Sequence, residues 1–148
     1  MNDTPARRAA PVHLRASSLA VVFAGGTAGA AAREALTLAF ATGDGIPWTI
    51  LAINLSGAFL LGVLVDSLVR RGPESGGRRT LRLLLGTGLL GGYTTYSALA
   101  MDTAALLGTG AVGAGIGYGV GTVLVGAVAT WAGILTAALL HRRHEERS

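Results

Sequence analysis

The residues best suited to chemistry lie in the segment 86–99, which reads GTGLLGGYTTYSAL. This segment belongs to a long apolar stretch, yet it combines glycines with adjacent threonines, tyrosines and a serine. Inside a bilayer, irregular polar backbone is stable only where it faces a cavity, an ion or another protein surface. Because glycine and β-branched residues are poor helix formers, the Gly-Gly-Tyr-Thr-Thr sequence at 91–95 predicts an interruption of a membrane helix.

An interrupted helix has two chemical consequences. Its unpaired carbonyl oxygens can coordinate a hard cation such as Na⁺. Tyr96, Ser97 and one of the two threonines, Thr94 or Thr95, can line a polar path. The alternative is an intact helix whose hydroxyls bond back to carbonyls one turn earlier. The two consecutive glycines and the two threonines favour the interruption.

Polar side chains in the other apolar stretches are further candidates, since intramembrane polar groups are costly and typically functional. Asn54 either bonds a neighbouring helix or offers an amide donor to an anion. Tyr118 and Thr122 are four residues apart and share a helix face, where their hydroxyls either form a short polar track or cap packing contacts. Arg33 is either functional or snorkels to the outer interface.

These residues need helices that cross a bilayer, and the composition provides them. The chain of 148 residues is 51% hydrophobic and 14% charged, with mean hydropathy +0.54, which is typical of a membrane protein. We predict an all-α four-helix membrane domain over 17–141, between a disordered basic tail at 1–16 and a charged tail at 142–148. Each span needs about 20 apolar residues, and the four segments that qualify are 18–42, 47–69, 81–107 and 111–140.

Glycines spaced by four residues predict close packing between these helices. Gly25 and Gly29 share this spacing in the first span, and Gly113, Gly117 and Gly121 repeat it in the fourth. The absence of cysteine excludes disulfides and thiolate metal sites.

The charges predict an orientation. Every basic residue is an arginine, and the arginines cluster between apolar runs rather than on one face of a folded domain, so no nucleic-acid partner is expected. In a four-span arrangement the arginine clusters lie on one side of the membrane, and the loops on the other side carry a single charged residue, Asp44. The positive-inside rule therefore places both termini in the cytoplasm of a multi-pass cell-membrane protein. The arginines on the cytoplasmic side are Arg7, Arg8, Arg15, Arg70, Arg71, Arg78, Arg79, Arg82, Arg142, Arg143 and Arg147.

Three motifs, in order, carry a resemblance to a known family. They are GGTAGAAARE at 25–34, INLSGAFLLG at 53–62 and GLLGGYTTYSAL at 88–99. Over residues 21–140 the chain resembles the Fluc (CrcB) fluoride channels. The resemblance implies a passive, selective channel through which fluoride leaves the cytoplasm, and no enzyme activity. It also implies an antiparallel dimer with two pores, whose third helix is broken mid-membrane around a structural Na⁺ that is not transported.

The resemblance assigns roles to residues by motif. The main-chain carbonyls of Gly91 and Thr94 would hold the Na⁺, and Arg33 would lie near the pore vestibule. The fluoride path would be lined by Asn54, Tyr96, Tyr118 and Thr122. Ser97, which belongs to the polar path predicted above, is added to this set.

Two features depart from the family pattern. The second phenylalanine of the third motif is Leu99 here and the first is Tyr96, so a fluoride station that uses a ring edge is altered. The one-sided arginines conflict with a homodimer of opposed subunits, which requires one sequence to insert both ways. We therefore hypothesise a fixed topology and an oppositely oriented homologue as partner.

Two rival functions remain open. A small multidrug-resistance-type transporter would use Glu34 as a proton-coupled carboxylate, although the spans are poor in the aromatic residues that hold cationic drugs. A non-conducting subunit of a heterodimeric channel is favoured by Leu99.

Overall fold

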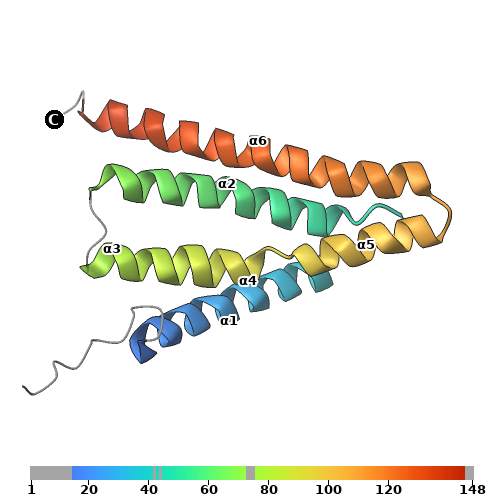
Figure 1. The fold of residues 1–148 in the computed structure, drawn as a ribbon, viewed down its shortest axis with the longest axis horizontal. Helices are drawn as coiled ribbons and strands as arrows, with labels where there is room; N and C mark the ends of the chain where they lie inside the picture. Colours follow the sequence, from blue (N-terminus) through green and yellow to red (C-terminus); the bar gives the residue numbers. More distant parts are fainter. Residues whose placement is uncertain (1–14, 42, 44, 73–75, 146–148) are drawn as a thin grey trace, which may run out of the picture.

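The computed structural model describes residues 15–41, 43, 45–72 and 76–145. Within these residues every regular element is a helix, which confirms the all-α prediction (Figure 1). The helices are α1 (Ala16–Ala39), α2 (Trp48–Arg70), α3 (Gly76–Leu81), the π-helical η2 (Arg82–Leu90), α4 (Gly91–Tyr93), α5 (Tyr96–Gly108) and α6 (Val112–Glu145).

The helices follow the four predicted segments and differ from them at the ends. α1 starts at Ala16 and ends at Ala39, three residues before the predicted end. α6 continues to Glu145 and so extends four residues into the predicted charged tail, since no glycine or proline interrupts that sequence. The predicted tail at 1–16 lies outside the described residues except for Arg15 and Ala16, and Asp44 lies outside them as well.

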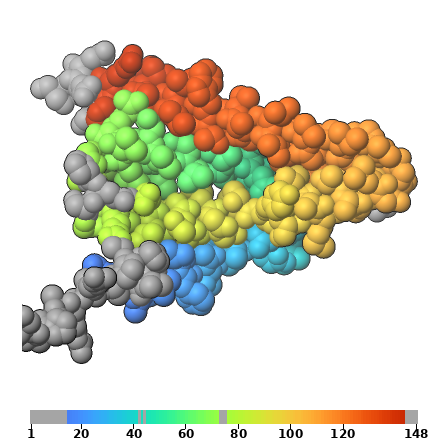
Figure 2. Space-filling view, in the orientation of Figure 1, coloured from blue at the N-terminus to red at the C-terminus, as the bar shows by residue number. Residues whose placement is uncertain are grey.

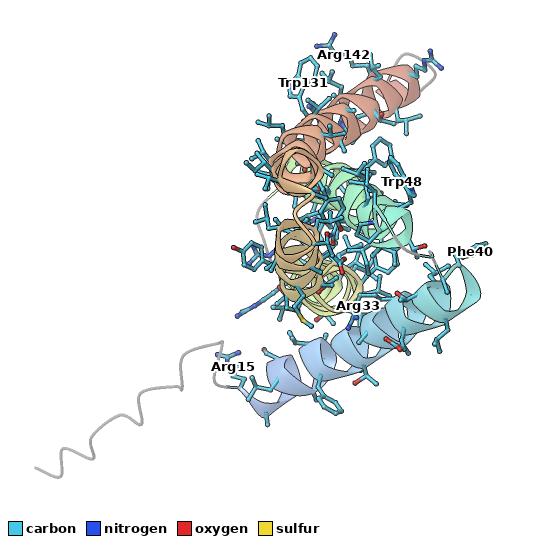
Figure 3. All side chains as sticks on the ribbon, turned by 90° about the vertical axis from the view of Figure 1, so that its right-hand side faces the viewer. Arg15, Arg33, Phe40, Trp48, Trp131 and Arg142 are labelled. Atoms are coloured by element: carbon cyan, nitrogen blue, oxygen red, sulfur yellow. The ribbon has the colours of Figure 1, made fainter. Side chains whose placement is uncertain are left out.

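Among the described residues, two helices are long and apolar enough to cross a bilayer by length and composition, namely Trp48–Arg70 and the Val112–Arg143 part of α6. Large apolar side chains cover the outside of the molecule, among them Phe40, Trp48 and Trp131 (Figure 3). Few side chains are buried, and Ile53 is the most enclosed of them. An apolar exterior around a thin core is expected for a protein that is solvated by lipid.

The two most extensive helix contacts are α2 with α6 and α1 with η2. α2 lies along α6, and α5 packs on the other end of α6. α1 packs against η2 and α4 on the opposite side. α3, η2 and α4 continue one another, and α5 follows after a short non-helical link.

Glycines make the closest of these contacts possible. A Cβ at Gly25 would collide with the Leu84 carbonyl oxygen of η2, and one at Gly29 would collide with the Leu89 carbonyl oxygen. The two backbones therefore touch directly, as the spacing of these glycines predicted. Gly117 behaves differently, since a Cβ there would meet no atom within 4 Å in the described part of the chain.

Candidate functional site

The backbone leaves helical geometry at two residues between α4 and α5. Thr94 has φ −78° and ψ 157°, and Thr95 has φ −147° and ψ 117°, so both are extended. Local sequence favours this, because both residues are β-branched and Thr95 can cap the next helix. The Thr95 hydroxyl oxygen accepts from the Ala98 amide at 3.1 Å and thereby starts α5.

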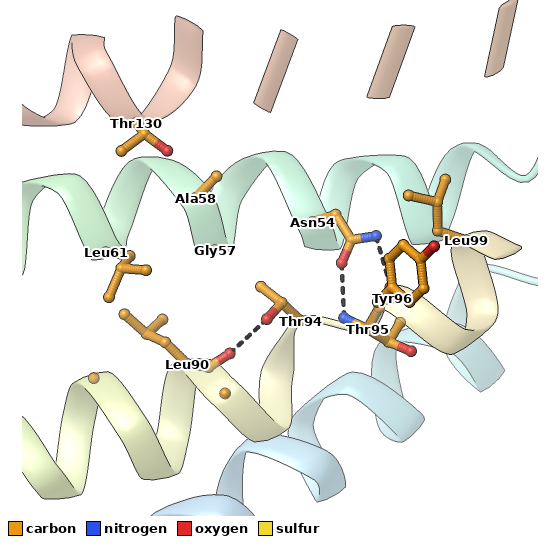
Figure 4. Close-up of a pocket in the computed structure, with 12 residues that line it drawn as sticks. Asn54, Gly57, Ala58, Leu61, Leu90, Thr94, Thr95, Tyr96, Leu99 and Thr130 are labelled. Atoms are coloured by element: carbon orange, nitrogen blue, oxygen red, sulfur yellow. Dashed lines mark hydrogen bonds between the residues drawn. The ribbon is translucent and has the colours of Figure 1, made fainter. Parts of the chain in front are cut away.

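Asn54 on α2 stabilises this extended link. Its Nδ2 donates to the Thr95 carbonyl oxygen at 3.1 Å, and its Oδ1 accepts from the Thr95 amide nitrogen at 2.8 Å (Figure 4). A primary amide can make this two-point contact because it carries a donor and an acceptor side by side. Thr95 thus satisfies its main-chain groups without a helical neighbour.

Two carbonyls lose their usual helical donors as a result. In a continuous helix, the carbonyl of one residue accepts from the N–H four residues later. The Thr95 amide donates to Asn54 instead of Gly91, and the Ala98 amide donates to the Thr95 hydroxyl instead of the Thr94 carbonyl. A Cβ at Gly91 would meet the Gly86 carbonyl oxygen at 3.9 Å, which is an ordinary van der Waals distance, so this position is not tightly packed. Carbonyl oxygens released in this way suit a hard cation such as Na⁺.

Arg33 contacts a third carbonyl of the same segment. Its Nε donates to the Gly92 carbonyl oxygen at 3.3 Å across the α1–α4 interface. The side chain is half-buried and points from α1 toward the other helices (Figure 3). This geometry argues against snorkelling, because the guanidinium lies against α4 rather than extending toward the end of α1.

A cavity of about 350 Å³ lies between α2 and the η2–α4–α5 segment. Figure 2 shows the molecular surface hollowed between α2 and this segment, and Figure 4 shows the cavity wall. The wall includes Asn54, both threonines of the interruption, Tyr96 and Leu99, and it continues along α2 past Gly57. The lining contains no charged side chain. Several of the residues predicted from the interrupted helix, together with Asn54, therefore line one cavity.

Tyr96 and Ser97 lie at the start of α5. The Tyr96 side chain is 81% exposed and stands at the rim of the cavity. The Ser97 hydroxyl lies 3.2 Å from the Thr95 hydroxyl, which connects it to the interruption.

Tyr118 and Thr122 lie elsewhere. Their relative exposures are 6% and 5%, and neither belongs to the wall of the cavity. The Thr122 hydroxyl donates to the Tyr118 carbonyl at 2.6 Å, and the Tyr118 hydroxyl donates to Asp102 at 3.4 Å. Leu99 connects the two regions, since it lines the cavity and also packs in the buried cluster with Tyr118.

Asp102 is a site residue that the sequence reasoning missed. It lies on α5 and is the acceptor for Tyr118, which lies on α6. One signal could have pointed to it, because it is the only acidic residue in the predicted third span. An intramembrane carboxylate is a functional candidate by default.

Most hydroxyl protons near the site are engaged within the protein. Those of Thr94, Thr122 and Tyr118 are donated to the Leu90 carbonyl, the Tyr118 carbonyl and Asp102 respectively. Asn54 uses one of its two N–H bonds for Thr95 and keeps a second in the cavity wall. The Asn54 amide is therefore an anion donor that this conformation leaves available at the interruption.

Comparison with known families shows which family this chain belongs to. The family model described as "CrcB-like protein, Camphor Resistance (CrcB)" matches residues 20–134. The chain belongs to the CrcB family. The resemblance inferred from the three motifs is thereby confirmed, and the match spans all the predicted site residues.

Similar proteins cover three quarters or more of this chain. "Fluoride-specific ion channel FluC 2" of Leifsonia xyli subsp. xyli is 48% identical over 134 residues, which is 90% of this chain and 92% of the relative. "Fluoride-specific ion channel FluC 1" of Cutibacterium acnes is 46% identical over 112 residues, 75% of this chain and 78% of the relative. "Fluoride-specific ion channel FluC" of Phenylobacterium zucineum is 41% identical over 122 residues, 81% of this chain and 94% of the relative.

Proposed function

We propose that this chain is a subunit of a fluoride-specific channel through which fluoride leaves the cytoplasm passively. The observation that carries the proposal is the Asn54 amide, which retains an N–H in the wall of an uncharged cavity beside an interrupted helix. The names of the relatives support fluoride as the ion. Residues 17–141 form the channel domain in this proposal.

The cavity chemistry suits conduction of a small, strongly hydrated anion. Such an ion needs several weak donors to replace water, whereas a fixed cation would hold it too tightly for transport. The lining has no cation, and Arg33 is engaged with a carbonyl. Tyr96 and Ser97 extend the path at the rim, and Tyr118 and Thr122 would contribute hydroxyls once their protons turn toward the ion.

The Gly91 and Thr94 carbonyls would hold a structural Na⁺ in the middle of the membrane. When bound, this ion supplies positive charge that stabilises the broken backbone. Replacing Na⁺ with N-methylglucamine should lower the thermal stability of the purified protein. Gly91→Ala should reduce this Na⁺ dependence more than Thr94→Ser does, because alanine favours a continuous helix that withdraws the carbonyl ligands, whereas Thr94→Ser changes only a side chain. Equal stability in both salts would contradict the sodium site.

We propose that the functional unit is an antiparallel dimer with both termini of this chain in the cytoplasm of the cell. One feature of the structure supports a second subunit, namely the glycine stripe of α6, where Gly113, Gly117 and Gly121 meet nothing within 4 Å in the described part of the chain. Eleven arginines on one side of the predicted topology favour a homologous partner of opposite orientation over a homodimer. The numbered names of two relatives agree with paired chains. Topology-reporter fusions that show both orientations in equal amounts would contradict this.

Fluoride efflux from liposomes, with and without a partner chain, tests the function. Efflux of fluoride but not of chloride is the expected result. Proton-coupled uptake of cationic drugs would instead favour the transporter, although its carboxylate Glu34 does not line the cavity. No efflux with any partner would favour a non-conducting subunit, for which the buried Leu99 is the structural argument.

A further inference from the structure

A second cavity lies at the end of the molecule where α1 and α3 begin. It measures about 270 Å³ and lies between the first turn of α1 and the α3–η2 segment. Arg15 and Arg79 line it together, although 64 positions separate them in the sequence. Packing of α1 against η2 brings these two arginines to one place.

The wall of this cavity is suited to a phosphate group. Besides the two guanidinium groups it carries three hydroxyl groups, from Ser17, Ser18 and Thr80, and no carboxylate among the residues that the structure describes. Guanidinium groups bind phosphate through paired N–H donors, and hydroxyls add further hydrogen bonds.

Neither arginine is neutralised by the rest of the described chain. The ion pair found there joins Arg70 to Asp66, at the end of α2. The first turn of α1 has no acidic residue and no side-chain cap, so the helix start adds partial positive charge to the same cavity.

The depth of the cavity relative to the membrane favours a lipid phosphate over a soluble anion. The remaining wall includes Val21 and Leu83, which belong to the apolar parts of α1 and η2. The cavity therefore spans the boundary between the apolar helix surfaces and the basic end of the molecule, which is the level of lipid headgroups. We propose that this cavity binds the headgroup phosphate of an anionic phospholipid.

Native mass spectrometry of the full chain in detergent tests the proposal, with phosphatidylglycerol as the probe and phosphatidylcholine for comparison. R15Q/R79Q should weaken phosphatidylglycerol binding by about tenfold more than the matched pair R142Q/R143Q does. The control pair removes the same charge from the same end of the molecule, on α6 and outside this cavity. T80V keeps every charge and should weaken binding severalfold by removing one hydroxyl.

The outcomes separate the possible sources of binding. Equal losses of phosphatidylglycerol affinity in R15Q/R79Q and in R142Q/R143Q would mean diffuse attraction to the basic surface and would overturn the proposal. Competition by inorganic phosphate at concentrations equal to those of the lipid would show a soluble-anion site and would also overturn it. If R15Q/R79Q fails to fold, an unchanged affinity in T80V is the result that contradicts the proposal.

Discussion

Replacing Asn54 with leucine tests the central argument about the site. Leucine has nearly the same size but can make neither of the two hydrogen bonds to Thr95, at 3.1 Å and 2.8 Å. It also removes the remaining N–H from the cavity wall. The freed Thr95 amide can then return to the Gly91 carbonyl, which would rebuild the helix at the interruption.

The magnitude follows from the number of bonds lost. Hydrogen bonds between membrane helices contribute about 0.6 kcal/mol on average and up to about 1.7 kcal/mol. Loss of both bonds therefore costs about 1–3 kcal/mol, part of which the rebuilt helical bond recovers. Loss of about 1.4 kcal/mol from the conducting arrangement slows transport about tenfold. We expect Asn54→Leu to lower fluoride flux at least tenfold and to reduce thermal stability only slightly.

The assay is fluoride efflux from liposomes, with the partner chain added where single-chain vesicles are silent. Ser56→Ala is the matched control, because Ser56 also joins α2 to α4, through a 3.0 Å hydroxyl contact with Tyr93, but does not line the cavity. Its flux should stay within about twofold of the original. The reasoning is refuted if Asn54→Leu conducts normally, or if both variants lose flux equally.

Three further substitutions test other parts of the structure. Arg33→Met removes the donor to the Gly92 carbonyl and should lower the melting temperature in detergent by about 3 °C; an unchanged value would show that this contact contributes no stability. Gly29→Val forces a side chain into the η2 backbone and should abolish the monodisperse peak in size-exclusion chromatography, whereas Gly108→Ala meets open space and should preserve it. Leu99→Phe places a ring in the cavity wall and should raise fluoride efflux; equal or lower efflux from a folded variant would mean that Leu99 is not limiting.

Much of the site could be predicted because its signals are local. The Gly-Gly-Tyr-Thr-Thr sequence at 91–95 disfavours helix by itself, and the structure has extended backbone at its two threonines. Asn54 stood out because an amide inside an apolar run is costly. Its partner could not be predicted, since the bond joins residues 41 positions apart and depends on how α2 packs.

Other features escaped sequence reasoning for the same reason. Spacing placed Tyr118 and Thr122 on one face but did not say what that face meets, and the structure buries them beside α5 rather than in the cavity. Asp102 acquired its role only through contact with α6. The sequence left open whether the threonines bond back to an intact helix or mark its interruption, and Thr94 does both. Its hydroxyl bonds back to the Leu90 carbonyl while its backbone is extended.

The sequence by itself determined the helical class and the family, because the first depends on composition and the second on short motifs. Only the tertiary structure decided which polar groups satisfy one another. The packing of α2 directs the Thr95 amide to Asn54 and so releases the Gly91 carbonyl, and the packing of α1 places Arg15 and Arg79 at one cavity. The pairings of Asn54 with Thr95 and of Arg15 with Arg79 are long-range, so they depend on how α2 and α1 pack rather than on the local sequence.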